Sequence, residues 1–224
     1  HYNALAYHAE HSGDEAKQRT YFSLAGITAQ AAFANETALY YYGRLLPLLP
    51  ETKAQRDIHL KRGAVFELIG NWKEAEIAYR AALACAKGDV AATARCQHAL
   101  GTLVHRNGDY DGALEWLAQV RDHWAALSDA SGMGQAEIEL GFVFWRKGDY
   151  AQAQQHLEAG YGLARAQGDL RGTALALNTL GNVANIRGDY AAAQALHEES
   201  LALRQTLGDK AAISMSFNNL GILA

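Results

Sequence analysis

An aspartate recurs every 20 residues between residues 89 and 209, and this interval constrains the fold more than any other feature of the chain. The seven positions are Asp89, Asp109, Asp129, Asp149, Asp169, Asp189 and Asp209. A glycine precedes six of them, and Ser128 is the exception. Glycine readily takes the left-handed conformation that closes a helix, and aspartate caps the free N–H groups that begin the next one. The interval therefore predicts an array of antiparallel helices of roughly 17–18 residues each, with the aspartates as caps rather than as a functional series.

Charge and composition exclude several classes of protein. Half of the 224 residues are hydrophobic, which is enough to bury a core, and the net charge of −4 argues against a non-specific nucleic-acid surface. Because the sequence shows neither an apolar run long enough to cross a membrane nor a leader peptide, we expect a cytoplasmic protein. We expect Cys85 and Cys96 to be free, buried thiols. The chain begins at His1 and ends at Ala224 within a predicted helix, so we expect a fragment of a larger protein.

Small residues form a second register. Its glycines are Gly26, Gly63, Gly101, Gly141, Gly181 and Gly221. Twelve residues after each of the first five stands an alanine: Ala38, Ala75, Ala113, Ala153 and Ala193. Two helices approach closely only where small side chains face each other, so we expect each glycine to meet the alanine of the next helix.

This pattern resembles the tetratricopeptide repeat, which pairs a Leu-Gly step in its first helix with a turn and an alanine in its second. The match includes Leu140-Gly141, Leu180-Gly181 and the Gly148-Asp149-Tyr150 turn. The period here is 40 residues, whereas the family's usual period is about 34. The chain is therefore similar to the long-helix variety found in bacterial multidomain signalling proteins, such as nucleotide-binding ATPase activators and adenylate or guanylate cyclases. The resemblance implies an all-α fold, a right-handed α-solenoid of antiparallel helix pairs.

The two registers together predict the boundaries of the elements. We expect helices near 2–12, 15–33, 35–48, 51–69, 72–86, 90–107, 110–127, 130–147, 150–167, 170–187, 190–207 and 210–224, and no strands. Residues 1–50 are predicted to form irregular helices with a first degenerate repeat. The regular repeats are expected at 51–88, 89–128, 129–168 and 169–208, with a truncated repeat at 209–224.

The resemblance also implies a concave groove lined by the first helix of each pair. Its ridge lies three residues before, one after and four after each Leu-Gly glycine, because such positions share one helix face. We predict that a partner contacts Arg95, His98, Thr102, His105, Arg106, Ile138, Glu139, Phe142, Trp145, Arg146, Asn178, Asn182, Asn185 and Asn218. The alternative is that these are ordinary surface residues, with Phe142 and Trp145 packing between repeats. The family's lysine and asparagine clamp for a terminal carboxylate is not predicted, since no lysine stands at its first position.

These residues favour a scaffold that binds a protein or peptide segment within a cytoplasmic bacterial signalling protein. One alternative is a sensor for a small molecule or short peptide that regulates an attached effector domain. A second is a structural or oligomerisation arm, with a possible homodimer through the exposed terminal helices. We predict no enzyme, no cofactor and no metal site, because His98 and His105 lie about 10.5 Å apart along a helix and cannot share one ion.

Overall fold

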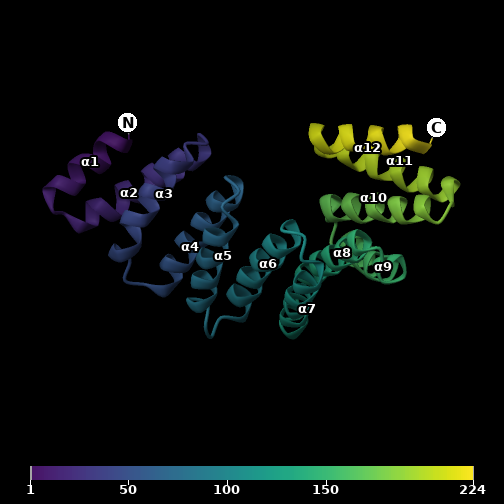
Figure 1. Ribbon diagram of the computed structural model, residues 1–224, viewed down its shortest axis with the longest axis horizontal. Coiled ribbons are helices and arrows are strands. Elements are labelled where there is room, and N and C mark those ends of the chain that lie inside the picture. The colour runs from purple at the N-terminus through teal and green to yellow at the C-terminus, as the bar shows by residue number, and fades with distance from the viewer. Residues whose placement is uncertain (1, 224) are drawn as a thin grey trace. The chain divides into compact units, whose positions relative to one another are not determined.

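The computed structural model describes residues 2–223, and within that range it is all-α (Figure 1). The α-helices are α1 (Tyr2–Ser12), α2 (Glu15–Ala31), α3 (Asn35–Leu45), α4 (Thr52–Leu68), α5 (Trp72–Ala84), α6 (Val90–Arg106), α7 (Tyr110–Ala126), α8 (Ala130–Lys147), α9 (Tyr150–Ala166), α10 (Leu170–Ile186), α11 (Tyr190–Leu207) and α12 (Lys210–Leu223). A short 3-10 turn, η1 (Leu46–Leu48), follows α3. The predicted helices and the absence of strands are confirmed within the described residues. The predicted end at residue 224 lies outside them.

The Gly-Asp junctions are confirmed as the devices that end one helix and begin the next. Asp149 shows the arrangement, since its Oδ1 accepts the N–H of Gln152 at 3.1 Å and its own N–H donates to the Phe144 carbonyl at 3.0 Å. All seven aspartates of the 20-residue series accept such a capping bond. Ser128, which replaces the glycine, also takes the left-handed conformation, with φ at 54°. Each aspartate therefore caps a helix, as predicted.

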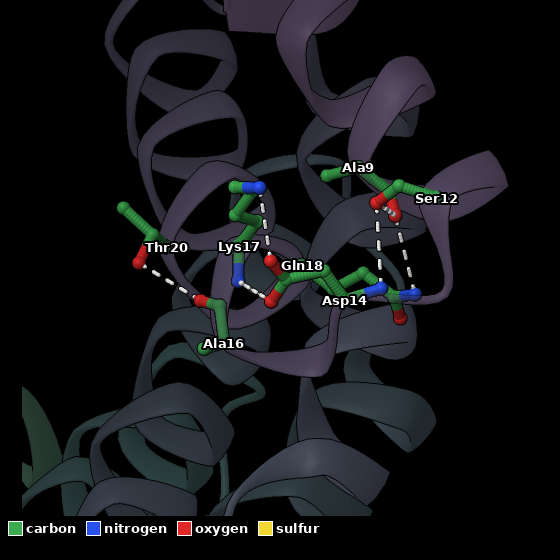
Figure 2. Close-up of polar contacts among 7 residues, drawn as sticks. All are labelled: Ala9, Ser12, Asp14, Ala16, Lys17, Gln18 and Thr20. Carbon is green, nitrogen blue, oxygen red and sulfur yellow. Dashed lines mark hydrogen bonds and ion pairs between the residues drawn. The ribbon is translucent and has the colours of Figure 1, made fainter.

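The junction between α1 and α2 uses the same device outside the 20-residue series (Figure 2). Asp14 follows Gly13 and accepts the N–H of Lys17 at 3.0 Å. The Asp14 N–H donates in turn to the Ser12 hydroxyl, and that hydroxyl donates to the Ala9 carbonyl. The backbone bond and the side chain of Lys17 lower the pKa of the Asp14 carboxyl. Local hydrogen bonds thus set the beginning of α2.

The close contact between the two helices of each pair involves other residues than predicted. A Cβ built on Gly181 would lie 2.7 Å from His197 Cε1, and one on Gly141 would lie 2.5 Å from Leu157 Cγ. Gly26 and Gly63 face Tyr42 and Tyr79 in the same way. Each of these glycines therefore faces the side chain of the residue 16 positions later. The predicted contact with the alanine 12 positions later is seen at Gly141, where the added Cβ would lie 3.0 Å from the Ala153 carbonyl oxygen, but the Leu157 side chain is nearer. The alanines are fully buried beside this contact, so both small residues admit one large side chain between the helices.

The chain divides into two compact units, the first ending at Leu103 and the second beginning at Val104. In the first unit, consecutive helices from α1 to α5 pack on one another around a core that includes Phe22, Tyr42 and Leu45. In the second, α7 to α12 pack consecutively, and α10 also contacts both α8 and α12. Alternate helices α8, α10 and α12 therefore form one layer. No helix among residues 2–223 is long and apolar enough to span a membrane.

Candidate functional site

The layer of α8, α10 and α12 presents the strongest candidate surface, because its helices carry mixed aromatic, amide and charged side chains that are partly exposed. We define the α8–α10–α12 face by eight residues. They are Gln135, Glu139, Phe142, Trp145, Leu175, Asn182, Asn185 and Asn219. The face combines an aromatic cluster, a cavity and an amide cluster.

The aromatic cluster joins the C-terminal ends of α6 and α8. Phe142 lies with its ring centroid 5.4 Å from that of His105 and 5.5 Å from that of Trp145. Such separations are typical of favourable aromatic contacts. Burial, together with Arg146 and Arg106, lowers the pKa of His105, so its imidazole is neutral at pH 7. The cluster is thus an apolar shelf with an uncharged polar edge.

A cavity of about 240 Å³ opens between α8 and the first turns of α10. Ile138 and Leu175 form its apolar lining, and its polar side chains are Gln135, Glu139, Asp169 and Arg171. Arg171 has no ion-pair partner among the described residues. The cavity can therefore hold one apolar side chain with a charged group of either sign beside it.

The amide cluster links α10 to α12. Asn219 Nδ2 donates to Asn178 Oδ1 at 3.0 Å and to Asn182 Oδ1 at 3.5 Å. In this cluster Asn219 takes the place predicted for Asn218. Asn218 is exposed, and its contact with a partner stays a prediction. Carbonyl and amide groups in a row suit the backbone of an extended peptide, which offers one donor and one acceptor per residue.

The predicted ridge needs correction at two further positions. Ile138 is 2% exposed and Asn178 is 6% exposed, so a partner can reach little of either side chain. The small residues of neighbouring helices explain the burial of Ile138, which packs against Gly160 of α9. Phe142, Trp145, Asn182 and Asn185 are half-buried.

The other predicted residues are distributed over both units. His105, Glu139, Arg106 and Arg146 belong to the second unit, where the two arginines are exposed. Arg95, His98 and Thr102 belong to the first unit. A single groove that includes all of them stays a prediction.

Gln135, Leu175 and Arg171 line the cavity but lie outside the predicted ridge. Gln135 and Leu175 each stand six residues before their glycine, one helical turn beyond the ridge that was considered. Extending the ridge by that turn would have found them. Arg171 lies near the start of α10 and follows no repeat position that the sequence marks.

Metal and thiol chemistry find little support in the part of the chain that the structure describes. It contains no group of three or more His, Cys, Asp or Glu side chains that could hold a metal ion. Cys85 and Cys96 are free thiols, as predicted, but Cys96 is buried and Cys85 is only half-buried, so the predicted burial is wrong for Cys85. Burial raises the pKa of Cys96 to about 11, so its thiol is protonated at neutral pH.

The final helix, α12, leaves apolar side chains exposed. Phe217 is 56% exposed and Ile222 is 66% exposed, whereas Ile213 and Leu220 are half-buried. Homodimerisation through this surface stays a prediction.

Comparison with known families decides the identity of the fold. The tetratricopeptide repeat family matches residues 55–126 and 132–206, which together are more than half of the chain. The chain belongs to the tetratricopeptide repeat family. Comparison with curated proteins finds no match.

Solved structures of this kind extend the likeness to nearly the whole chain. Aspartyl phosphate phosphatase F from Bacillus subtilis is similar with a TM-score of 0.83 at 12% identity, over 93% of this chain and 55% of the phosphatase. The Rap conjugation gene regulator of plasmid pLS20, solved in complex with the Phr peptide, has a TM-score of 0.73 at 16% identity, over 93% and 59%. A Signal Transduction ATPase with Numerous Domains from Pyrococcus horikoshii, which has a tetratricopeptide repeat sensor, has a TM-score of 0.79 at 12% identity, over 92% and 32%. At these identities the likeness concerns the fold.

Proposed function

We propose that this tetratricopeptide repeat chain is a non-catalytic binding module, and that its α8–α10–α12 face engages an extended peptide or protein segment. The observation that carries this proposal is the combination, on one face, of a side-chain-sized cavity, an aromatic shelf and an amide cluster. Grooves of this kind bind peptides through apolar anchors, with polar groups that set orientation.

The parts of the face suggest how a segment would lie. One apolar side chain would enter the cavity beside Leu175, and a second would rest on Phe142 and Trp145. The backbone between them would pair with the amides of Asn182 and Asn185. Burial and the neighbouring Arg106 and Arg146 keep His105 neutral, but these two exposed arginines leave positive charge at the aromatic end. At the cavity, Arg171 and Glu139 would select the charge next to the first anchor.

One of the similar structures supports this reading. The pLS20 Rap regulator was solved with a bound peptide, and it shares the fold of this chain. We propose further that the module belongs to a cytoplasmic bacterial regulatory protein and has a protein or peptide as its partner.

The proposal is tested by affinity capture from lysate with quantitative mass spectrometry. The variant Trp145→Ala/Asn182→Ala removes the shelf and one amide, and Gln194→Ala/Glu198→Ala on α11 serves as the matched control. We expect the control variant to capture the same partners as the wild type. The amount of those partners captured by Trp145→Ala/Asn182→Ala should fall at least tenfold. Equal capture by both variants would contradict the proposal.

A second candidate is a sensor for a short peptide or small molecule that regulates an attached effector domain. The repeat sensor of the similar Pyrococcus horikoshii protein favours it. In this case the full-length protein would change its effector activity when ligand is added, and Trp145→Ala/Asn182→Ala would abolish the response. A partner that binds with no change in effector activity would favour the scaffold.

A further inference from the structure

A second cavity lies in the first unit, between α2 and α4, in a region to which the sequence analysis assigned no site. Its volume is about 550 Å³, within the roughly 300–1,000 Å³ typical of ligand sites. The α2 side of this cavity lies before residue 55, where the family match begins. We infer that this cavity binds an acidic peptide segment whose apolar side chain enters between α2 and α4 and whose carboxylate meets Lys61 and Arg19.

The apolar part of the cavity is built from four aliphatic residues. They are Leu24 of α2, Leu45 at the end of α3, Leu49 after η1 and Ile58 of α4. Leu45 and Ile58 are nearly fully buried, so they make a fixed floor, and Leu24 and Leu49 are half-buried walls. Removing an apolar side chain of a ligand from water here would favour binding.

The charged rim favours an anion. Lys61 is half-buried and has no ion pair or hydrogen bond with any described residue. Arg19 donates to the Leu48 carbonyl at 3.3 Å, which holds its guanidinium at the rim. Among the described residues its one ion-pair partner is Glu15, at 4.0 Å. The one acidic group that lines the cavity, Asp57, already accepts two hydrogen bonds from Arg56.

A hydroxyl group adds a contact for a peptide backbone. Ser23 lines the cavity and makes no hydrogen bond to another described residue. The neighbouring Thr20 differs, because its hydroxyl already donates to the Ala16 carbonyl at 3.0 Å (Figure 2). Ser23 is thus the hydroxyl with capacity to bind a ligand carbonyl or amide.

The spacing of these groups defines the ligand. Ile58 and Lys61 lie three residues apart on α4, about 4.5 Å along its axis. In an extended peptide, alternate side chains point to the same side and lie about 6.8 Å apart. The flexible Lys61 side chain can span the difference between these two distances. We therefore expect the apolar and the acidic residue of the bound peptide to be two positions apart.

The experiment is a selection of random octapeptides displayed on phage, using the full chain as target. The enriched peptide sequences are compared for three targets: the wild type, Arg19→Glu/Lys61→Glu, and the charge-matched control Lys73→Glu/Lys87→Glu. We expect the wild type and the control to enrich sequences with an apolar and an acidic residue two positions apart. The rim variant should lose them. For an enriched peptide labelled with fluorescein, the Kd should rise at least tenfold on the rim variant and stay unchanged on Trp145→Ala/Asn182→Ala.

Other results would overturn the inference. It is wrong if no such sequences are enriched, if the rim variant binds them as the wild type does, or if replacing their acidic residue by glutamine leaves the Kd unchanged. The cavity would instead be a site for a lipid carboxylate if the chain binds no octapeptide but binds a fluorescent fatty acid that decanoate displaces. Should Arg19→Glu/Lys61→Glu lose helical circular dichroism, Lys61→Gln replaces it, since Lys61 makes no contact that the fold needs.

Discussion

Replacing Gly181 by alanine should destabilise the chain, although alanine is the better helix former. The new Cβ would lie 2.7 Å from Cε1, 2.8 Å from Nε2 and 3.0 Å from Nδ1 of His197. Carbon atoms in favourable contact are about 3.5–4.0 Å apart. His197 is 1% exposed, so its ring cannot move aside without displacing its neighbours. Overpacking of this kind costs about 1–3 kcal/mol, against a gain of about 0.8–1.0 kcal/mol from the helix propensity of alanine.

Gly162 provides a matched control within the same unit. It lies inside α9 on an exposed surface, and a Cβ there would meet no atom within 4 Å. Gly162→Ala should therefore stabilise the chain by up to about 1 kcal/mol. The propensity gain is common to both variants, so the difference between their free energies of unfolding isolates the clash, at about 1–3 kcal/mol.

Thermal unfolding followed by circular dichroism would measure this difference. One kcal/mol shifts the midpoint of a chain of this size by about 2–4 °C, so Gly181→Ala should melt several degrees below Gly162→Ala. In a His197→Ala background the clash is absent, and the gap between the two glycine variants should close. If Gly181→Ala stabilises the chain as much as Gly162→Ala does, the proposed packing of the ring on the glycine is wrong.

Three further predictions follow from buried or strained residues. Burial and Arg204 lower the pKa of His197, so the folded state favours the neutral ring. The free energy of unfolding should therefore be highest above pH 6.5 and fall as the pH drops below it. In urea unfolding, His197→Leu should show a weaker pH dependence than the wild type. Ser128→Gly should raise the melting midpoint by the few degrees that about 1 kcal/mol represents, because φ there is 54°, and an unchanged or lower midpoint would show that Ser128 is not strained. A maleimide at pH 7.5 should label Cys85 in the native chain but Cys96 only after unfolding, since Cys96 is buried and its pKa is about 11; native labelling of Cys96 at an equal rate would contradict that burial.

Much of the fold is predictable because its signals are local. The Gly-Asp junctions place the helix ends through hydrogen bonds that reach only a few residues along the chain, as at Asp149. The register of glycines also identifies the close contacts, although the contacting partner was assigned to the wrong residue. A ring such as Tyr79 needs the space that Gly63 leaves, and nothing in the 12-residue interval reveals that.

The site was less predictable because it depends on contacts between helices. A ridge deduced from one helix cannot show that Gly160 of the next helix lets Ile138 sink into the core. Likewise, a shift from Asn218 to Asn219 is a rotation of about 100° around α12. That rotation is set by Arg204 of α11, whose guanidinium donates to Ser216 Oγ at 2.8 Å and turns that side of α12 inward. The cavity between α2 and α4 is completed by Leu45 and Leu49, which flank η1 and follow no repeat position, so the repeat pattern does not predict it.

The double role of the junction aspartates has a consequence for how such a chain changes in length. The hydrogen bonds that each junction aspartate makes reach at most five residues along the chain. A helix pair therefore contains the residues that define its own helix ends, wherever the pair is inserted. Duplication or loss of 40 residues would leave every remaining helix end satisfied, and only the packing faces of the neighbours would have to agree. The same locality keeps contact order low, which favours rapid folding that can begin at any junction and spread to the next.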